Sequence, residues 1–389
     1  MRYSPQNIYI CKKSMARYIY QRENWTDFTW DEKKIGVLLA KVRYLQGQIL
    51  GKMTTLGFDF QEESTLKNIT LDVMKSSEIE GEKLNMKQVR SSIARRLGLE
   101  VSGLINSPRN VDGIVDMMLD ATQFYEKPLT EKRLFDWHGA MFPTGRSGIY
   151  SIKVAQYRTG EMQIVSGGFG NEKVHYEAVL AKNVKSEMDI FLNWVNTNNE
   201  HDSIIKAAIS HLWFVTIHPF DDGNGRIART ITDMLLARSD ESKKRFYSMS
   251  AQINKERKQY YQALEKVQHH SEDSDITIWL EWFLNCLKNA LLSSEKILKT
   301  VLTKADFWNK HAKTTLNERQ KLMLNKLLDG NFVGKLQSSK WAKMCKCSQD
   351  TAIRDIKDLI EKGILQQEES GGRSTNYALK ENDNNTNIS

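Results

Sequence analysis

The chain has 389 residues, a formal net charge of +8 and only five prolines, where ordinary usage of about 5% would give roughly nineteen. Because proline is frequent in loops and breaks helix interiors, its scarcity predicts a mainly helical protein. It argues against a β-sandwich, a collagen-like repeat or a proline-rich disordered chain. The mildly basic charge suits a protein that handles phosphate groups or nucleic acid, but it requires neither.

The N-terminal sequence lacks the unbroken apolar core of a signal peptide. The longest apolar stretches, such as 212–217, are too short to cross a bilayer. These observations predict a cytoplasmic protein with no membrane partner. Four cysteines are too few for a disulfide framework, and a zinc site at Cys345 and Cys347 would need two further ligands, so we expect free thiols.

The first 105 residues are predicted to form an N-terminal helical segment. Apolar residues recur at spacings of three and four over 31–55, which predicts one helix. The same spacing begins again at about residue 63 and predicts a second helix that ends at Gly81. Further helices are predicted over 86–97, 111–125, from Thr130, over 186–196 and 203–216, from Gly225, and over 275–301.

Between residues 148 and 176 the pattern changes from helical to extended. Two β-type stretches, 163–166 and 173–176, flank a glycine-rich connection. This arrangement predicts a β-hairpin over about 157–176, inside a core domain that we expect to extend over 106–305.

The most informative segment runs from His218 to Arg229 and reads HPFDDGNGRIAR. Pro219 disfavours helical angles at the residue before it, so the preceding amphipathic helix should end at His218. Gly223 and Gly225 allow a tight loop whose amides face one point. The next helix begins there, and a helix N-terminus favours a bound anion.

The side chains of this segment add a base, a metal ligand and two cations. Arg226 and Arg229 share a helix face and suit a polyphosphate. Asp222 is a hard oxygen ligand suited to Mg²⁺ that bridges phosphates. His218 can act as a general base. The alternative is a helix–loop–helix in which His218 is an ordinary core histidine, and the combination of residues argues against it.

The segment matches HxFx(D/E)GNGRxxR at every specified position and resembles the Fic family of nucleotidyl transferases. The resemblance implies that His218 deprotonates a Ser, Thr or Tyr hydroxyl of a target protein. That hydroxyl attacks the α-phosphate of ATP, releases pyrophosphate and becomes AMP-modified. By the same resemblance Asp222 holds Mg²⁺, the β- and γ-phosphates bind the two arginines, and the anion hole is lined by Gly223, Asn224 and Gly225.

The related Doc kinases depart from this motif at the second glycine and at the arginine after it. Gly225 and Arg226 therefore favour nucleotidyl transfer over phosphate transfer.

The resemblance also assigns roles outside the motif. The predicted hairpin falls where the family has its flap, whose edge pairs with the target peptide by strand addition. Ile164 and Val165 are both candidates to clamp the modified side chain. Tyr260 and Tyr261 lie in a segment that resembles the family's adenine region, and a role as core aromatic residues is an equal alternative for both.

A second, shorter motif lies upstream. Residues 76–81, SSEIEG, match the pattern (S/T)xxxE(G/N) that marks an inhibitory helix in Fic proteins. By resemblance, Glu80 pairs with Arg229 and takes the place of the γ-phosphate, while Ser76 holds the helix against the core and Gly81 ends it. The alternative is an exposed acidic cluster of Glu78, Glu80 and Glu82.

The pattern restarts over 314–380, where three helices (317–328, 338–346 and 348–362) precede a hairpin over 364–379. This order resembles a winged helix. Gln349, Thr351 and Arg354 would lead the recognition helix, and Arg373 would tip the wing. The region is only weakly basic, so it permits DNA binding but equally permits protein docking or dimerisation. The polar tail 381–389 is predicted to be disordered.

Several functions therefore stay open. The first hypothesis is a protein adenylyltransferase inhibited by Glu80, with ATP as co-substrate, Mg²⁺ as cofactor and a separate protein or the chain itself as target. The alternatives are a de-AMPylase in which Glu80 positions a water, transfer from another nucleotide donor, and a DNA-binding regulator whose core senses nucleotide. The intact His218 favours an enzyme, because a sensor needs no base. A homodimer also stays open.

Overall fold

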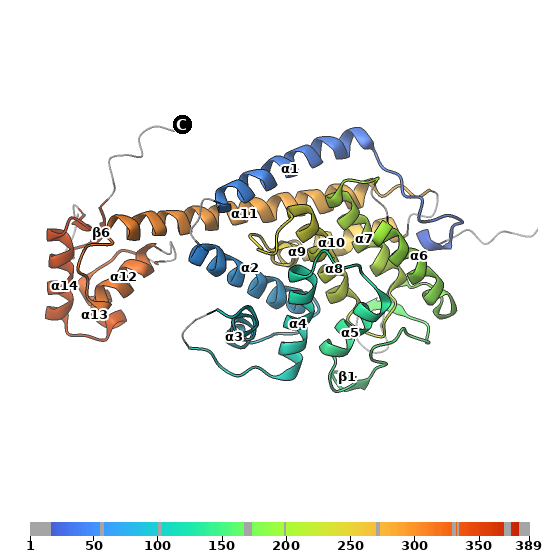
Figure 1. Cartoon of the computed structure of the whole chain (residues 1–389), viewed down its shortest axis with the longest axis horizontal. Helices are drawn as coiled ribbons and strands as arrows, with labels where there is room; N and C mark the ends of the chain where they lie inside the picture. The colour runs from blue at the N-terminus through green and yellow to red at the C-terminus, as the bar shows by residue number, and fades with distance from the viewer. Residues whose placement is uncertain are drawn as a thin grey trace, which may run out of the picture. The chain divides into compact units, whose positions relative to one another are not determined.

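Figure 1 shows a computed structural model of the chain. It describes residues 17–54, 58–99, 103–166, 173–197, 200–269, 273–328, 332, 334–368 and 375–380. The chain divides into two compact units, residues 1–294 and 295–389, which are described separately. The domain boundary expected between 305 and 314 falls inside the second unit. Three predicted features lie outside the described residues: the glycine-rich connection of the hairpin expected over 157–176, Arg373 and the polar tail.

The first unit is built almost wholly of helices, so the predicted mainly helical class is confirmed (Figure 1). Two short 3₁₀ helices cover Ile19–Gln21 and Ala181–Asn183. The α-helices are α1 (Glu32–Thr54), α2 (Phe58–Ile79), α3 (Met86–Leu97), α4 (Arg109–Gln123), α5 (Glu131–Met141), α6 (Val184–Thr197), α7 (Ser203–Ile217), α8 (Asn224–Asp240), α9 (Met249–Lys255) and α10 (Arg257–Gln268). Helix α11 (Thr277–Lys310) begins in this unit and continues into the second.

Helix α7 forms the centre of the first unit. Its residues are buried from Ile204 to Ile217, and it packs against α8. Trp213 lies in an aromatic group with Trp25, Phe28 and Phe191. A helix buried on all sides is fixed by packing rather than by its own propensity, so the core determines where its C-terminal end lies.

Helix α2, which carries the upstream motif, packs on α3 and α9 and also contacts α8. Its buried Asp72 accepts hydrogen bonds from the Ser248 hydroxyl at 2.6 Å and from the Ser250 amide at 3.2 Å. These contacts attach the helix to the segment that follows α8.

Two antiparallel hairpins interrupt the helices. Strands β3 (Gln163–Ser166) and β4 (Lys173–Glu177) form the predicted hairpin, with a register shift between Ile164 and Val165. A second hairpin, β1 (Arg146–Ser147) and β2 (Tyr150–Ser151), was not predicted. Strands of two residues are too short to show an alternating pattern, so sequence periodicity could not have found it.

The second unit contains α12 (Glu318–Leu328), α13 (Ser338–Cys345) and α14 (Gln349–Glu361), followed by the antiparallel strands β5 (Leu365–Gln367) and β6 (Tyr377–Leu379). Its core is centred on the fully buried Trp341, with Met323, Ile356 and Leu359 around it. Three helices and a hairpin follow in the expected order, and the assignment to the winged-helix class stays a prediction.

Within the described ranges, no helix combines the length and the apolar character that crossing a bilayer requires.

Candidate active site

His218 lies at the point where α7 ends. The helix stops at Ile217, and His218 takes a left-handed backbone conformation with φ 53°. Such a conformation costs a residue with a side chain about 1–2 kcal/mol. The buried Arg158 compensates: its Nε donates to the His218 carbonyl at 2.8 Å, and its own amide donates to the Pro219 carbonyl at 2.9 Å.

The environment of His218 keeps one ring nitrogen available as a base. Nδ1 lies 3.3 Å from the Val215 carbonyl. A carbonyl can only accept, so this contact places the proton on Nδ1 and leaves the lone pair on Nε2. Burial lowers the pKa of His218 to about 4, with the cation of Arg158 acting in the same direction. The imidazole is therefore neutral at pH 7.

The loop that follows is closed by its own side chains. The Asn224 amide accepts from the Phe220 N–H at 2.9 Å and donates to the Phe220 carbonyl at 2.8 Å. Phe220 is fully buried and stacks on His138, with ring centroids 4.3 Å apart. Gly223 caps α8 in the left-handed region, at φ 83°. Asn224 thus shapes the loop through its side chain, since both ends of its amide are engaged within it.

Asp222 presents a half-exposed carboxylate beside this loop. One oxygen accepts from the Gly223 amide at 2.6 Å, and the other accepts from the Ser147 hydroxyl and lies 3.6 Å from Arg226. Within the described residues no cluster of three metal-ligating side chains exists. One carboxylate next to arginine cations still fits Mg²⁺, because this ion is commonly held by one or two carboxylates plus substrate phosphates and water.

Arg229 is buried and held by the end of α2. Its side chain, 1% exposed, donates to the Ser76 hydroxyl at 2.9 Å, to the Ser76 carbonyl at 3.0 Å and to Glu80 Oε1 at 2.7 Å. Glu80 follows the last residue of α2, and Gly81 completes the turn at φ 86°. The sequence-predicted residues Ser76, Glu80 and Arg229 are therefore in direct contact.

The Glu80 carboxylate also lies against the first turn of α8. A Cβ atom built on Gly225 would stand 2.2 Å from Glu80 Oε1, so only glycine leaves room for the carboxylate. A helix N-terminus attracts anions, and here it faces an anion that the chain itself supplies.

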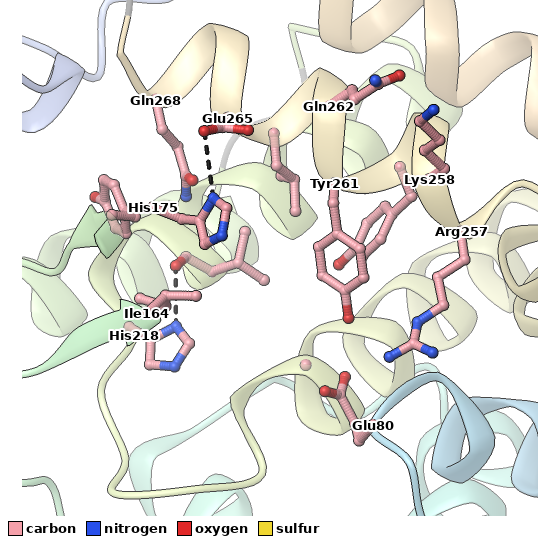
Figure 2. A pocket seen from close by; sticks show the side chains of 15 residues that line it. Glu80, Ile164, His175, His218, Arg257, Lys258, Tyr261, Gln262, Glu265 and Gln268 are labelled. Atoms are coloured by element: carbon pink, nitrogen blue, oxygen red, sulfur yellow. Dashed lines mark hydrogen bonds and ion pairs between the residues drawn. The ribbon is translucent and has the colours of Figure 1, made fainter. Parts of the chain in front are cut away.

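A pocket of about 710 Å³ opens between these groups (Figure 2). His218 and Ile164 form one side of it, and Glu80, Tyr261 and Arg257 form the other. The lining also includes Tyr260, Gly225, His175, Glu265 and Gln268. His175 on β4 and Glu265 on α10 lie 3.4 Å apart, which joins the hairpin to the pocket wall.

The two tyrosines predicted near the nucleotide differ in their surroundings. Tyr260 is buried, and its hydroxyl lies 3.0 Å from His211, so it is part of the core and of the pocket wall at once. Tyr261 is exposed at the pocket edge, beside Arg257. Of the two flap candidates, Ile164 reaches the pocket, while the side chain of Val165 lies outside the described part of the structure.

A second pocket, of about 900 Å³, lies on another side of Glu80. It contains Asp222 and Arg226 from the predicted motif, and Arg109 and Arg146 line it as well. Glu80 lines both pockets. The predicted phosphate-binding residues are thus divided between two pockets that meet at one carboxylate.

In the second unit, the predicted DNA-contacting residues Gln349, Thr351 and Arg354 form hydrogen bonds around the start of α14. Ser348 accepts from the Thr351 amide and caps α14, while Gln349 reaches Ser338 at 3.3 Å and Arg354 reaches Thr351 at 3.4 Å. Their role in DNA binding stays a prediction, and Arg373 lies outside the described residues.

Sequence reasoning missed the residues that support the site. Arg158 and Ser147 contact the motif from 60 and 75 positions upstream. Neither stands in a local pattern, so no signal in one sequence could have identified them. Glu82 was visible only as part of an acidic cluster.

Two families match parts of the chain. Residues 128–236 match the Fic/DOC family, and residues 18–99 match a domain of unknown function, DUF4172. The Fic/DOC match contains the loop from His218 to Arg229, and the other match contains Ser76 and Glu80.

The chain is also similar to named proteins. Protein adenylyltransferase Fic of Drosophila mojavensis is 29% identical over 153 residues, 39% of this chain and 26% of that protein. The protein of the same name from Drosophila grimshawi is 24% identical over 217 residues, 55% of this chain and 40% of that protein. This chain therefore spans less than half the length of these curated relatives.

Among solved structures, a Fic domain containing signaling protein from Bacteroides thetaiotaomicron aligns with a TM-score of 0.50 at 19% identity. The alignment covers 67% of this chain and 98% of that one. At this identity the similarity concerns the fold alone.

Proposed function

We propose, from the match of residues 128–236 to the Fic/DOC family, that the protein transfers AMP from ATP to a hydroxyl side chain of a target protein. The observation that carries the proposal is that His218 is neutral and has a free lone pair on Nε2. His218 lines the same pocket as Gly225, in the first turn of α8. The similarity to protein adenylyltransferases supports it.

The reaction follows from these groups. His218 Nε2 accepts the proton of the target hydroxyl as the oxygen forms a bond to the α-phosphorus of ATP. The bond between the α-phosphorus and the bridging oxygen breaks, and pyrophosphate leaves with that oxygen. The first turn of α8 stabilises negative charge on the phosphates, and Arg226 and Arg229, together the phosphate clamp, are cations suited to bind them. Asp222 would hold Mg²⁺, which when bound neutralises phosphate charge.

The resting chain is proposed to be inhibited by Glu80. Its carboxylate is bonded to Arg229 and lies on Gly225. Two anions in that place would repel one another, so the terminal phosphates of ATP cannot lie there in a productive pose while Glu80 stays. Because Ser76 bonds the same guanidinium, the end of α2 and the clamp arginine form one connected unit.

The test is labelling of a cell lysate with α-³²P-ATP by the purified chain. Glu80→Gly is expected to label target proteins strongly, and Glu80→Gly combined with His218→Ala is expected to label none, because the base is lost. Glu78→Gln is the matched control for Glu80, since Glu78 lies in the same turn but pairs with Lys75 and Asn254.

Mass spectrometry of the labelled bands would identify the modified residue and show whether it carries a hydroxyl. Absence of label with Glu80→Gly would count against AMP transfer, and equal label with the unmodified chain would count against inhibition by Glu80.

A further inference from the structure

Glu82 forms an ion pair with Arg226, the other arginine of the proposed phosphate clamp. Its Oε2 lies 2.7 Å from Arg226 Nη1. The Arg226 side chain is 7% exposed and the Glu82 side chain 36% exposed. Neither the upstream motif nor the pairing of Glu80 with Arg229 accounts for this contact.

The surroundings of Arg226 show why the contact matters. Its guanidinium lies over the Phe142 ring at 5.1 Å, and Asp222 approaches it only to 3.6 Å. The Nε atom is buried and, within the described structure, has no hydrogen-bond partner. A buried cation requires an anion close by, and Glu82 supplies the shortest charged contact that Arg226 makes.

Both clamp arginines are bonded to carboxylates from a single turn. The amides of Glu80 and Glu82 both donate to the Ser77 carbonyl, at 3.1 and 3.0 Å. Gly81 between them has φ 86°, a conformation that places the two carboxylates on neighbouring arginines of α8. The turn therefore neutralises the two positive charges that a polyphosphate would bind.

We propose that Glu82 is a positioning residue for nucleotide binding: it holds Arg226 in the resting chain and competes with the terminal phosphates of ATP for that guanidinium. The proposal rests on the proposed function, because it assigns Arg226 to those phosphates. The proposal adds that, after removal of Glu80, Glu82 still competes with ATP for Arg226. ATP then still has to displace Glu82, which lines the second pocket together with Asp222.

The competition predicts a selective effect of Glu82→Gln. Glutamine keeps the length and an acceptor oxygen but removes the charge. Because the pair is partly exposed, its loss should tighten ATP binding by about two- to fivefold. AMP lacks the β- and γ-phosphates, so its affinity should not change. A purely structural role for Glu82 would alter both ligands together.

Two measurements test this in the Glu80→Gly background. Calorimetric titration of ATP and of AMP into the His218→Ala form compares Glu82→Gln with Glu78→Gln, the control from the same turn. It needs no transfer activity, so a lower Kd for ATP here, together with no labelling by the Glu80→Gly form that keeps His218, would uphold this inference and reject the proposed function. With His218 intact, the KM for ATP should fall while kcat stays within about twofold.

Unchanged or weaker ATP binding in Glu82→Gln would overturn the proposal, and so would an equal change in ATP and AMP affinity. Glu82→Ala is the second variant should the glutamine variant fold poorly, and it must show the same selectivity for ATP over AMP.

Discussion

The site on α8 and the leading end of α14 both contain arginines, but in opposite environments. Arg229 is buried, with three hydrogen bonds to Ser76 and Glu80. Arg354 is exposed and, among the residues that the structure describes, hydrogen-bonds to Thr351 of its own helix. A buried charge must be compensated by the fold, so its partners indicate what it binds. An exposed charge carries no such constraint, which is why the geometry supports a function for α8 and leaves α14 as a prediction.

The sharpest test of this contrast is removal of the buried charge. Arg229→Ala leaves Glu80 without its partner and breaks both contacts to Ser76. Loss of one member of a buried pair costs about 3–5 kcal/mol, although the partial exposure of Glu80 places the expected loss at the lower end. Urea unfolding followed by circular dichroism measures it. A loss below about 1 kcal/mol would mean that the buried contacts do little to hold α2.

The pH dependence of labelling tests the burial of His218. The base must be neutral, and burial lowers its pKa to about 4. Removal of Glu80 lowers this pKa further, because the carboxylate favours the charged imidazole. Labelling by Glu80→Gly should therefore stay nearly level from pH 8 to pH 5.5. With an ordinary histidine it would fall about tenfold at pH 5.5, and such a fall would contradict the burial argument.

Asp72, a buried residue of α2, provides a test of whether the stability of the chain depends on pH. Burial, with the nearby Asp233, raises the pKa of Asp72 well above its ordinary value. The folded chain then binds a proton more tightly than the unfolded chain, so stability is lost as pH rises from about 4 through the raised pKa.

Asparagine does not titrate, so Asp72→Asn removes the loss of stability that Asp72 causes as the pH rises. Between pH 5 and pH 8, the free energy of unfolding of the variant should increase by about 1 kcal/mol relative to that of the unmodified chain. Urea midpoints at the two pH values give the difference. Glu63→Gln, on the same helix, is the control because Glu63 is exposed, whereas Asn68 is unsuitable because it is buried. A difference independent of pH would rule out the titration of Asp72.

The smallest effect is expected on the exposed side of the comparison. Arg354→Ala should change the stability of the chain by less than about 0.5 kcal/mol, since its contacts are local. Gel shifts at low and moderate salt, with and without this change, examine the DNA-binding hypothesis. No shift of the unmodified chain at low salt would remove that hypothesis, and a shift that Arg354→Ala abolishes would give α14 the role that its geometry alone does not assign.

The predictable part of the site is the part that is contiguous in sequence. The loop from His218 to Arg229 could be interpreted because Pro219 and the glycines fix its backbone locally, and the structure ends α7 and begins α8 within one residue of the expected positions. The contact between Glu80 and Arg229 spans 149 positions. It was expected only through a resemblance, since no local rule connects the two residues.

Other features could not be predicted because they depend on packing between distant segments. Ser147 reaches Asp222 from a hairpin too short to predict. Glu82 pairs with Arg226 over 144 positions, although its sequence context is typical of a solvated acidic cluster. Helix propensity and hydrophobic spacing determine the elements, whereas these contacts depend on how α2, β1 and α8 pack.

The hydrogen bonds of Arg158 bear on the rate of the proposed reaction. Besides the His218 carbonyl, its buried guanidinium donates to the carbonyls of Ile217, Gly160 and Val179. These bonds hold the base in an uncommon backbone conformation before any ligand arrives. The loss of conformational entropy that orders the base is thus incurred during folding and not in the transition state. For the proposed AMP transfer, the activation barrier then need not include the entropic cost of ordering His218.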